Sequence, residues 1–261
     1  MTAAMRVMGN AALVGYEEVR AQFTWKSWLF GWVARSAAQV LFYAAMGLAV
    51  GSEEFIPYAF LGNVVASAAL MGLAVGPDTA AERFNGTLPL LVAAPRSLLP
   101  VFAGRSLSHL VQGTVEAMIV FSILAPFFGF PDRWWWLPLG LTVVVAGTYG
   151  LGLCLAAVSI DRYRISNLLM NVSFYLLVAI GGVNVPTDVF PRWVQLAASV
   201  LPLHHGLLGV RELVVTGPSA AVAGRFGLEL TVGAAWLALG LLGFRFSAES
   251  GRRDGSIDFA E

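Results

Sequence analysis

The 261-residue chain is poor in charge and rich in apolar residues. Only 12% of its residues are Asp, Glu, Lys or Arg, and 57% are hydrophobic, whereas about 25% of the residues of a soluble domain are charged. A soluble monomer of this length could not cover so much apolar surface, so the composition excludes a disordered chain, a nucleic-acid-binding protein and a disulfide-bonded scaffold. It predicts an all-α polytopic membrane protein.

The first 27 residues predict a cytoplasmic N-terminus that contains an amphipathic helix. Ala12, Tyr16, Val19 and Phe23 recur at helical spacing opposite a charged face. This pattern is typical of a helix that lies on the inner leaflet of the membrane. A short, frayed terminal helix is the alternative interpretation.

Six apolar segments follow, each close to the length of about 20 residues that crosses a hydrocarbon core. They predict a single six-helix transmembrane domain over residues 28–246. The polar residues 247–261 are expected to form a disordered cytoplasmic tail. The predicted spans are 28–50, 55–77, 98–125, 134–159, 165–185 and 223–246.

The positions of the basic residues predict the orientation of these spans. With a cytoplasmic N-terminus, most Lys and Arg residues outside the spans fall on the inner side, as the positive-inside rule requires. An even number of spans then returns the C-terminus to the cytoplasm. The only lysine, Lys26, lies in FTWKSW and not in a Gly-rich phosphate-binding loop, so we do not expect this chain to be a P-loop ATPase.

Residues 78–97, between spans two and three, predict a broken amphipathic segment on the cytoplasmic side. Asp78 or Thr79 is suited to cap a short helix. Gly86 then allows a turn, Thr87 is suited to cap a second helix, and Pro95 would end it. We interpret this segment as a docking element for a soluble partner, and a connecting loop on the inner leaflet is the alternative.

The third span carries a stripe of polar residues. Arg105, His109, Gln112 and Glu116 are spaced four, three and four residues apart, which places them on one face of a helix. Ionisable groups within a span usually face the bundle interior or a water-filled path. The stripe therefore predicts either a translocation path or a purely structural polar seam between helices, and Arg35 in the first span is placed to contact it.

Segment 193–210 is apolar but is interrupted by Pro202, His204 and His205. Because proline ends regular helix, we interpret the segment as an outer re-entrant or interfacial hairpin and not as a seventh span. The two adjacent histidines point to different faces and have no acidic cluster beside them, so no metal site is predicted. No serine stands in a nucleophile-elbow context, and no catalytic residue is predicted.

Two sequence patterns carry a resemblance to a known family. Residues 82–88 read ERFNGTL and are followed by Leu91 and Pro95. This pattern resembles the E-R-x-x-G-T-L-E-x-L-x-x-x-P signature of ABC-2-type permeases, the membrane subunits of ABC exporters. Pro89 stands where the family usually has an acid, so a salt bridge at that position is not expected. Residues 202–211, PLHHGLLGVR, are similar to the family segment P-L-T-H-x-x-x-x-x-R.

The resemblance covers nearly the whole chain and implies a transport mechanism. Such a permease forms half of a translocation path with a second copy or a related permease. It couples through residues 78–96 to two separate ABC ATPase subunits, which bind ATP and Mg, and it needs no cofactor of its own. The motif positions carried over to coupling are Glu82, Arg83, Gly86, Thr87 and Leu88, and those of the outer segment that would shape the exit are Pro202, His204, His205 and Arg211.

The substrate class follows from the weakly charged spans, which favour an amphiphilic compound. We therefore expect export of a drug or antibiotic. The excess of Arg over Lys is typical of a GC-rich bacterial genome, so we expect the chain in a bacterial inner membrane. Lipid or polysaccharide export by the same architecture, a stand-alone secondary carrier and an intramembrane enzyme are the alternatives. A carrier would need ion-binding acids near the midplane, and among the span residues Glu116 alone qualifies.

Overall fold

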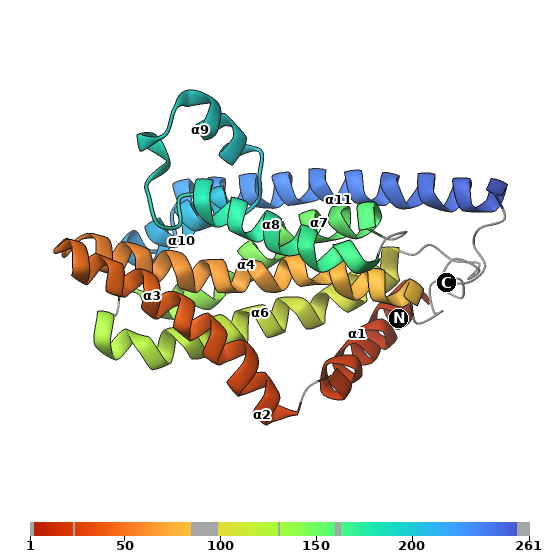
Figure 1. The fold of residues 1–261 in the computed structure, drawn as a ribbon, viewed down its shortest axis with the longest axis horizontal. Helices are drawn as coiled ribbons and strands as arrows, with labels where there is room; N and C mark the ends of the chain where they lie inside the picture. Colours follow the sequence, from red (N-terminus) through yellow and green to blue (C-terminus); the bar gives the residue numbers. More distant parts are fainter. Residues whose placement is uncertain (1–2, 23, 85–98, 130, 160–162, 255–261) are drawn as a thin grey trace.

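The computed structural model describes residues 3–22, 24–84, 99–129, 131–159 and 163–254, and these residues contain helices and no strand (Figure 1). The first half consists of α1 (Ala3–Gln22), α2 (Trp25–Ser27), the π-helix η1 (Trp28–Val33), α3 (Ala34–Val50), α4 (Phe55–Phe84) and α6 (Leu99–Phe128). The second half consists of η2 (Trp134–Trp136), α7 (Leu137–Ser159), α8 (Tyr163–Ile180), η3 (Thr187–Val189), α9 (Arg192–Ser199), α10 (His204–Thr216) and α11 (Ala220–Asp254).

Helix α4 is the centre of the bundle. It packs against α3, α6, α7 and α8, and its apolar stretch is almost wholly buried inside the protein. Helix α7 packs on α4 with one side and on α11 with another, while α10 fits against both α7 and α11. The core of the protein therefore lies around α4 and α7, and the long α11 forms its outer layer (Figure 1).

Glycines allow α7 and α11 to approach closely. A Cβ atom on Gly150 of α7 would overlap the backbone carbonyl of Gly233 in α11, and a Cβ atom on Gly233 would overlap Gly147. Helices in lipid gain much of their association energy from such close packing of small residues. Gly147, Gly150 and Gly233 are therefore packing residues at this crossing.

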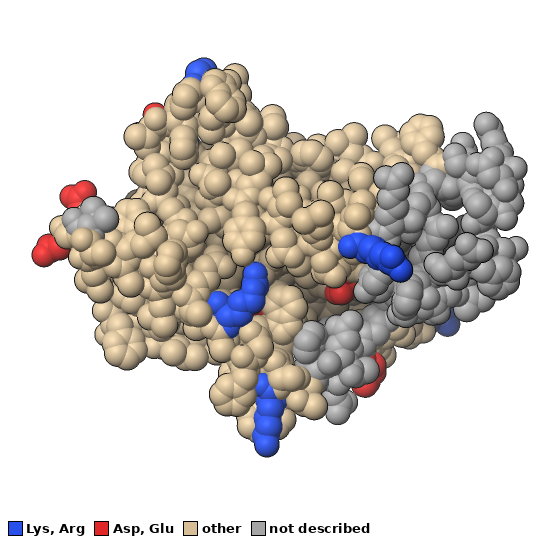
Figure 2. Space-filling view, in the orientation of Figure 1, with Lys and Arg blue, Asp and Glu red and all other residues tan. Residues whose placement is uncertain are grey.

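Four of the described helical stretches are long and apolar enough to cross a membrane, namely 55–80, 108–128, 134–159 and 220–244. Helix α8 is shorter than the predicted span 165–185. It ends at Ile180, and Gly182 then adopts a left-handed φ of 92°. The predicted span 28–50 corresponds to the consecutive helices α2, η1 and α3. The surface in Figure 2 is mostly uncharged, as expected of a protein surrounded by lipid.

Two expectations about helix ends are wrong. Asp78 and Thr79 do not begin a new helix, because α4 continues through Pro77 to Phe84. Proline is tolerated within membrane helices, where neighbouring groups satisfy the freed backbone carbonyl. The tail is not disordered from residue 247, because α11 continues to Asp254. Nucleation of a helix is unfavourable, but the preceding span of α11 is already helical. Extending that helix through the good helix formers Ala248, Glu249 and Arg252 therefore costs little free energy.

The N-terminal helix α1 is 20 residues long and packs against α6. Its buried contacts come from Ala11 and Gly15, whereas Tyr16 of the predicted apolar face is exposed. The start of α1, the end of α4, the start of α6 and the end of α11 all lie at one end of the bundle (Figure 1). The first and last described residues therefore lie at the same end of the bundle (Figure 1).

Candidate functional site

The polar stripe of the third span lies on α6, and its deepest member is Glu116. This carboxylate is fully buried, and its Oε1 accepts a hydrogen bond of 2.6 Å from the Ser36 hydroxyl of α3. Its Oε2 has no hydrogen-bond partner among the described residues. Arg35, the neighbour of Ser36, is close enough to act electrostatically on Glu116. The structure thus brings the first and third predicted spans together at these three side chains.

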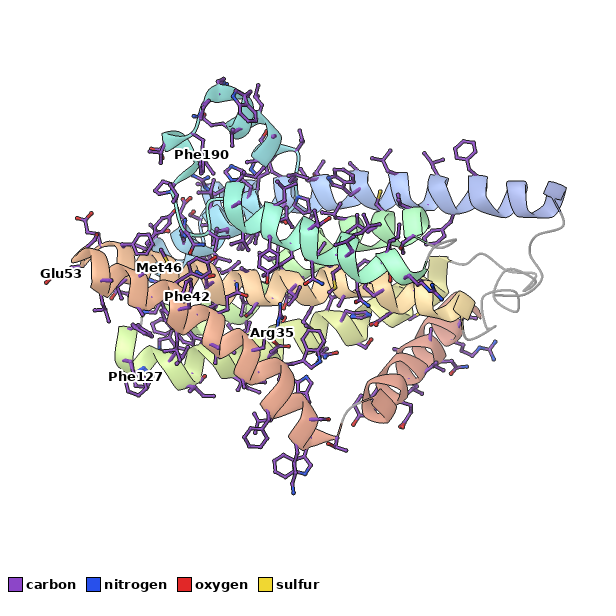
Figure 3. All side chains as sticks on the ribbon, in the orientation of Figure 1. Arg35, Phe42, Met46, Glu53, Phe127 and Phe190 are labelled. Atoms are coloured by element: carbon purple, nitrogen blue, oxygen red, sulfur yellow. The ribbon has the colours of Figure 1, made fainter. Side chains whose placement is uncertain are left out.

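Arg35 is a charged residue within the predicted first span. Its guanidinium lies 5.8 Å from the ring centroid of Trp32, within the range of a cation–π contact, and its Nη1 is buried with no hydrogen-bond partner among the described residues. Trp32 belongs to the π-helix η1, a rare conformation that occurs often at functional sites. Figure 3 shows Arg35, Phe42 and Met46 following one another along α3 toward Glu53.

The rest of the stripe extends toward the end of the bundle where α6 begins. His109 Nε2 lies 3.7 Å from the Asp78 carboxylate of α4, and its ring lies 6.3 Å from that of Tyr149 in α7. Gln112 is half-buried between His109 and Glu116. Arg105 belongs to α6, but its side chain lies outside the described residues. The polar stripe therefore contacts α3, α4 and α7.

A second polar cluster lies at the other end of α4. Arg211 of α10 donates hydrogen bonds to the backbone carbonyls of Gly182 (2.9 Å), Val183 (3.0 Å) and Tyr58 (3.2 Å). Its guanidinium lies 3.4 Å from the centroid of the Tyr58 ring, and the Tyr58 hydroxyl donates to Gly182 as well. Burial lowers the pKa of Arg211 to about 10, so the side chain keeps its charge at neutral pH. Arg211 therefore holds the loop after α8 against α4.

Amide side chains continue this cluster toward α3. Asn63 of α4 donates to the Asn184 side chain over 2.7 Å and accepts a hydrogen bond of 3.2 Å from Gln39 of α3. These residues were not predicted as site residues from the sequence, although polar side chains within apolar segments are a visible signal. They join α3, α4 and the loop after α8 by hydrogen bonds that do not depend on burying apolar surface.

The outer segment is broken as its proline predicts. Helices α9 and α10 are separated by a turn that contains Pro202, and Leu203 in this turn has a φ of 88°. His204 Nδ1 lies 3.3 Å from the Gly181 carbonyl, and His205 Nε2 lies 3.0 Å from the Ser199 carbonyl. Burial lowers the pKa of His204, which favours the neutral ring. Both histidines follow the break, and each therefore contacts a backbone carbonyl of a residue that precedes it.

Glu229 is a further site residue that was not predicted from the sequence. This residue of α11 is fully buried, and its carboxylate accepts hydrogen bonds from the backbone N–H groups of Leu203 (2.6 Å) and Gly206 (2.8 Å). An acid within an apolar span was a visible signal, but its partners are backbone groups more than 20 residues earlier. Among the described residues, no group of three His, Cys, Asp or Glu side chains is arranged to hold a metal ion.

The motif residues of the inner segment divide into two groups. Glu82 and Arg83 belong to the last turn of α4, at the end of the bundle where α1 begins and α11 ends (Figure 1). Gly86, Thr87 and Leu88 lie outside the described residues. The ERFNGTL sequence thus starts on the central helix itself and not on a separate element.

The comparison with known protein families agrees with this architecture. The sequence model of the ABC-2 type transporter family matches residues 20–215, which is most of the chain. The chain belongs to the ABC-2 type transporter family. No curated protein matches it. As a member of this family, the permease is a multi-pass membrane component of an ABC transporter, it is not itself an ATPase, and it associates with ABC ATPase partners.

Proposed function

We propose that the permease forms half of the translocation path of an ATP-driven exporter of amphiphilic compounds such as drugs or antibiotics. It crosses a bacterial inner membrane six times, through 28–50, α4, α6, α7, α8 and α11, and both of its termini are cytoplasmic. The observation that carries this proposal is a polar cluster of Arg35, Ser36 and Glu116, here called the seam, inside the bundle of an ABC-2 type permease.

The seam supports a translocation path because its hydrogen bonding is incomplete. Buried polar groups in proteins are almost always hydrogen-bonded, and an unpaired one is costly in an apolar surrounding. Arg35 Nη1 and Glu116 Oε2 both have no hydrogen-bond partner among the described residues. A passing compound with hydroxyl, amide or amine groups would satisfy both atoms, so the seam suits an uncharged or zwitterionic amphiphile better than a polyanion.

The exposed face of α8 supports a second permease beside this one. Asn167, Asn171 and Tyr175 are spaced four residues apart and share a face, and the Tyr175 side chain is 58% exposed. Amide side chains in a span are unfavourable against lipid and associate with other helices. We expect a second copy or a related permease to cover this face of α8, so that the path runs between the two subunits.

The inner end of the permease supports coupling to the ATPase. Residues 78–96 include the ERFNGTL motif, and its first residues, Glu82 and Arg83, extend the central helix α4. Two ATPase subunits that bind ATP and Mg would close on this segment in each half of the transporter. The permease itself would hold no cofactor. Movement of the segment would then reach the core directly, because α4 contacts α3, α6, α7, α8 and α10.

Purification from the native membrane tests the proposal. We expect an ABC ATPase to co-purify with the tagged permease, and a strain that lacks both genes to become more susceptible to exported compounds. The matched control is a strain that expresses the permease with an ATPase unable to hydrolyse ATP, which should be as susceptible as the deletion. Transport by the lone permease under an ion gradient, with no ATPase bound, would contradict the proposal.

A further inference from the structure

Helix α10 begins without a capping side chain of its own. The N-cap position is Leu203, whose apolar side chain makes no capping hydrogen bond. The first N–H groups of a helix have no partner within the helix, and Ser, Thr, Asp or Asn usually supplies one from the N-cap position. Leu203 also has a φ of 88°, which is an uncommon conformation for a residue with a branched side chain. This start needs stabilisation from elsewhere.

The last span supplies the missing cap. Glu229 of α11 is 0% exposed, and its two carboxylate oxygens accept hydrogen bonds from the N–H groups of Leu203 and Gly206, over 2.6 and 2.8 Å. A carboxylate at a helix N-terminus is also favoured by the helix dipole. We propose that Glu229 is a positioning residue, which caps α10 from α11 and thereby fixes the outer segment to the last span.

Glycines on two helices make room for this contact. A Cβ atom on Gly147 of α7 would overlap Glu229 Oε1, and a Cβ atom on Gly206 of α10 would lie 3.0 Å from Glu229 Cγ. The carboxylate therefore sits where α7, α10 and α11 meet. Since glycine has no side chain at these two positions, a larger residue at either one would displace Glu229 from the α10 terminus.

A second bond from α11 holds the same turn. Trp236 Nε1 donates to the Val200 carbonyl over 2.9 Å, three residues before the turn reaches Leu203. Glu229 and Trp236 lie seven residues apart, which is two helical turns. The turn between α9 and α10 is thus tied to α11 on both sides of Pro202. We infer that this turn moves together with α11 during transport, an inference that rests on the proposed role of the outer segment in shaping the exit.

Hydrogen exchange in the assembled transporter with Glu229→Gln tests the cap. An amide side chain has one acceptor oxygen, and its NH2 group would face an N–H donor, so one of the two capping bonds is lost. We expect amide exchange of residues 203–206 to become about 10- to 100-fold faster, with exchange in α4 unchanged. We also expect export to fall while ATP hydrolysis continues.

Glu212→Gln is the matched control. Glu212 also joins α10 to α11, through an ion pair of 2.8 Å with Arg225, but it is partly exposed and does not touch the turn. Unchanged exchange at 203–206 in Glu229→Gln, or an equal rise in Glu212→Gln, would overturn the proposal. If Glu229→Gln does not fold, Glu229→Asp against Glu212→Asp carries the same comparison, because Asp keeps both acceptor oxygens on a shorter stem. The exchange result stands whether or not the compound exported is the proposed one.

Discussion

Glu116 and Glu229 are both fully buried carboxylates, but their hydrogen bonding differs. Both oxygens of Glu229 accept backbone N–H groups, whereas Glu116 binds the Ser36 hydroxyl through Oε1 and has no partner at Oε2 among the described residues. The first arrangement is complete and structural. The second leaves capacity for another donor, which is what a residue in contact with a transported compound requires.

Substitution of the polar stripe on α6 tests this difference at the residue scale. Glu116→Gln keeps an acceptor for Ser36 but removes the negative charge, so we expect the unfolding temperature to stay within a few degrees and export to fall by about tenfold or more. Arg105→Gln is expected to lower export as well. Ser122→Ala is the control, because the Ser122 side chain is exposed and, among the described residues, bonds only to the Met118 carbonyl of its own helix. Wild-type export and stability in both Glu116→Gln and Arg105→Gln would contradict a role in the path.

The hydrogen-bond partners of the site residues could not be predicted from the sequence. Helical spacing was enough to place Arg105, His109, Gln112 and Glu116 on one face of α6. It could not show that Ser36 bonds Glu116, because that contact joins residues 80 positions apart. The role of Glu229 was hidden for a further reason: its partners are backbone N–H groups, which every residue except proline carries and which therefore leave no mark in a sequence.

At the scale of elements, the spans were predictable because their physical requirement is simple. An apolar stretch of sufficient length is needed, and charge marks its limits, so the predicted spans 98–125 and 134–159 match α6 and α7 closely. Helix ends were harder, since Pro77 does not end α4 and the polar residues after 246 do not end α11. The apolar composition of a segment indicates that it is buried in lipid or protein. The position of a helix end depends instead on neighbouring groups that hydrogen-bond to its terminal backbone groups.

The crossing of α7 and α11 gives a prediction at this scale. Gly150→Ala would place a methyl group against the Gly233 carbonyl and force the two helices apart, so we expect a loss of about 1–3 kcal/mol in the free energy of unfolding. The measurement is unfolding of the purified permease in mixed micelles. Gly224→Ala is the matched control, because no atom lies within 4 Å of a Cβ there. Equal stability of the two variants would show that close approach at Gly150 does not stabilise the bundle.

At the scale of the whole molecule, the arrangement of the ends predicts sidedness. Met5 in α1 is exposed at the end of the bundle where α11 finishes, and Trp193 in α9 is 72% exposed after α8. Five of the proposed spans lie between them, so they should face opposite sides of the membrane. In a Cys154→Ser background, a membrane-impermeant thiol reagent should label Met5→Cys only in inverted vesicles and Trp193→Cys only in whole cells. Labelling of both from the same side would contradict six spans with cytoplasmic ends.

The central helix has a mechanical consequence. Glu82 and Tyr58 belong to the same α4, 24 residues apart, and are thus separated by roughly 36 Å along the axis. An α-helix resists compression along its axis. Under the proposed coupling, an axial displacement of Glu82 is therefore transmitted to Tyr58, where the Arg211 guanidinium lies 3.4 Å from the ring centroid. Pro77, which lies five residues before Glu82, removes one backbone hydrogen bond of α4, so we expect the helix to bend there. Under the proposed coupling, a sideways movement of the ATPase would bend α4 at Pro77, and a lengthwise movement would reach the loop after α8.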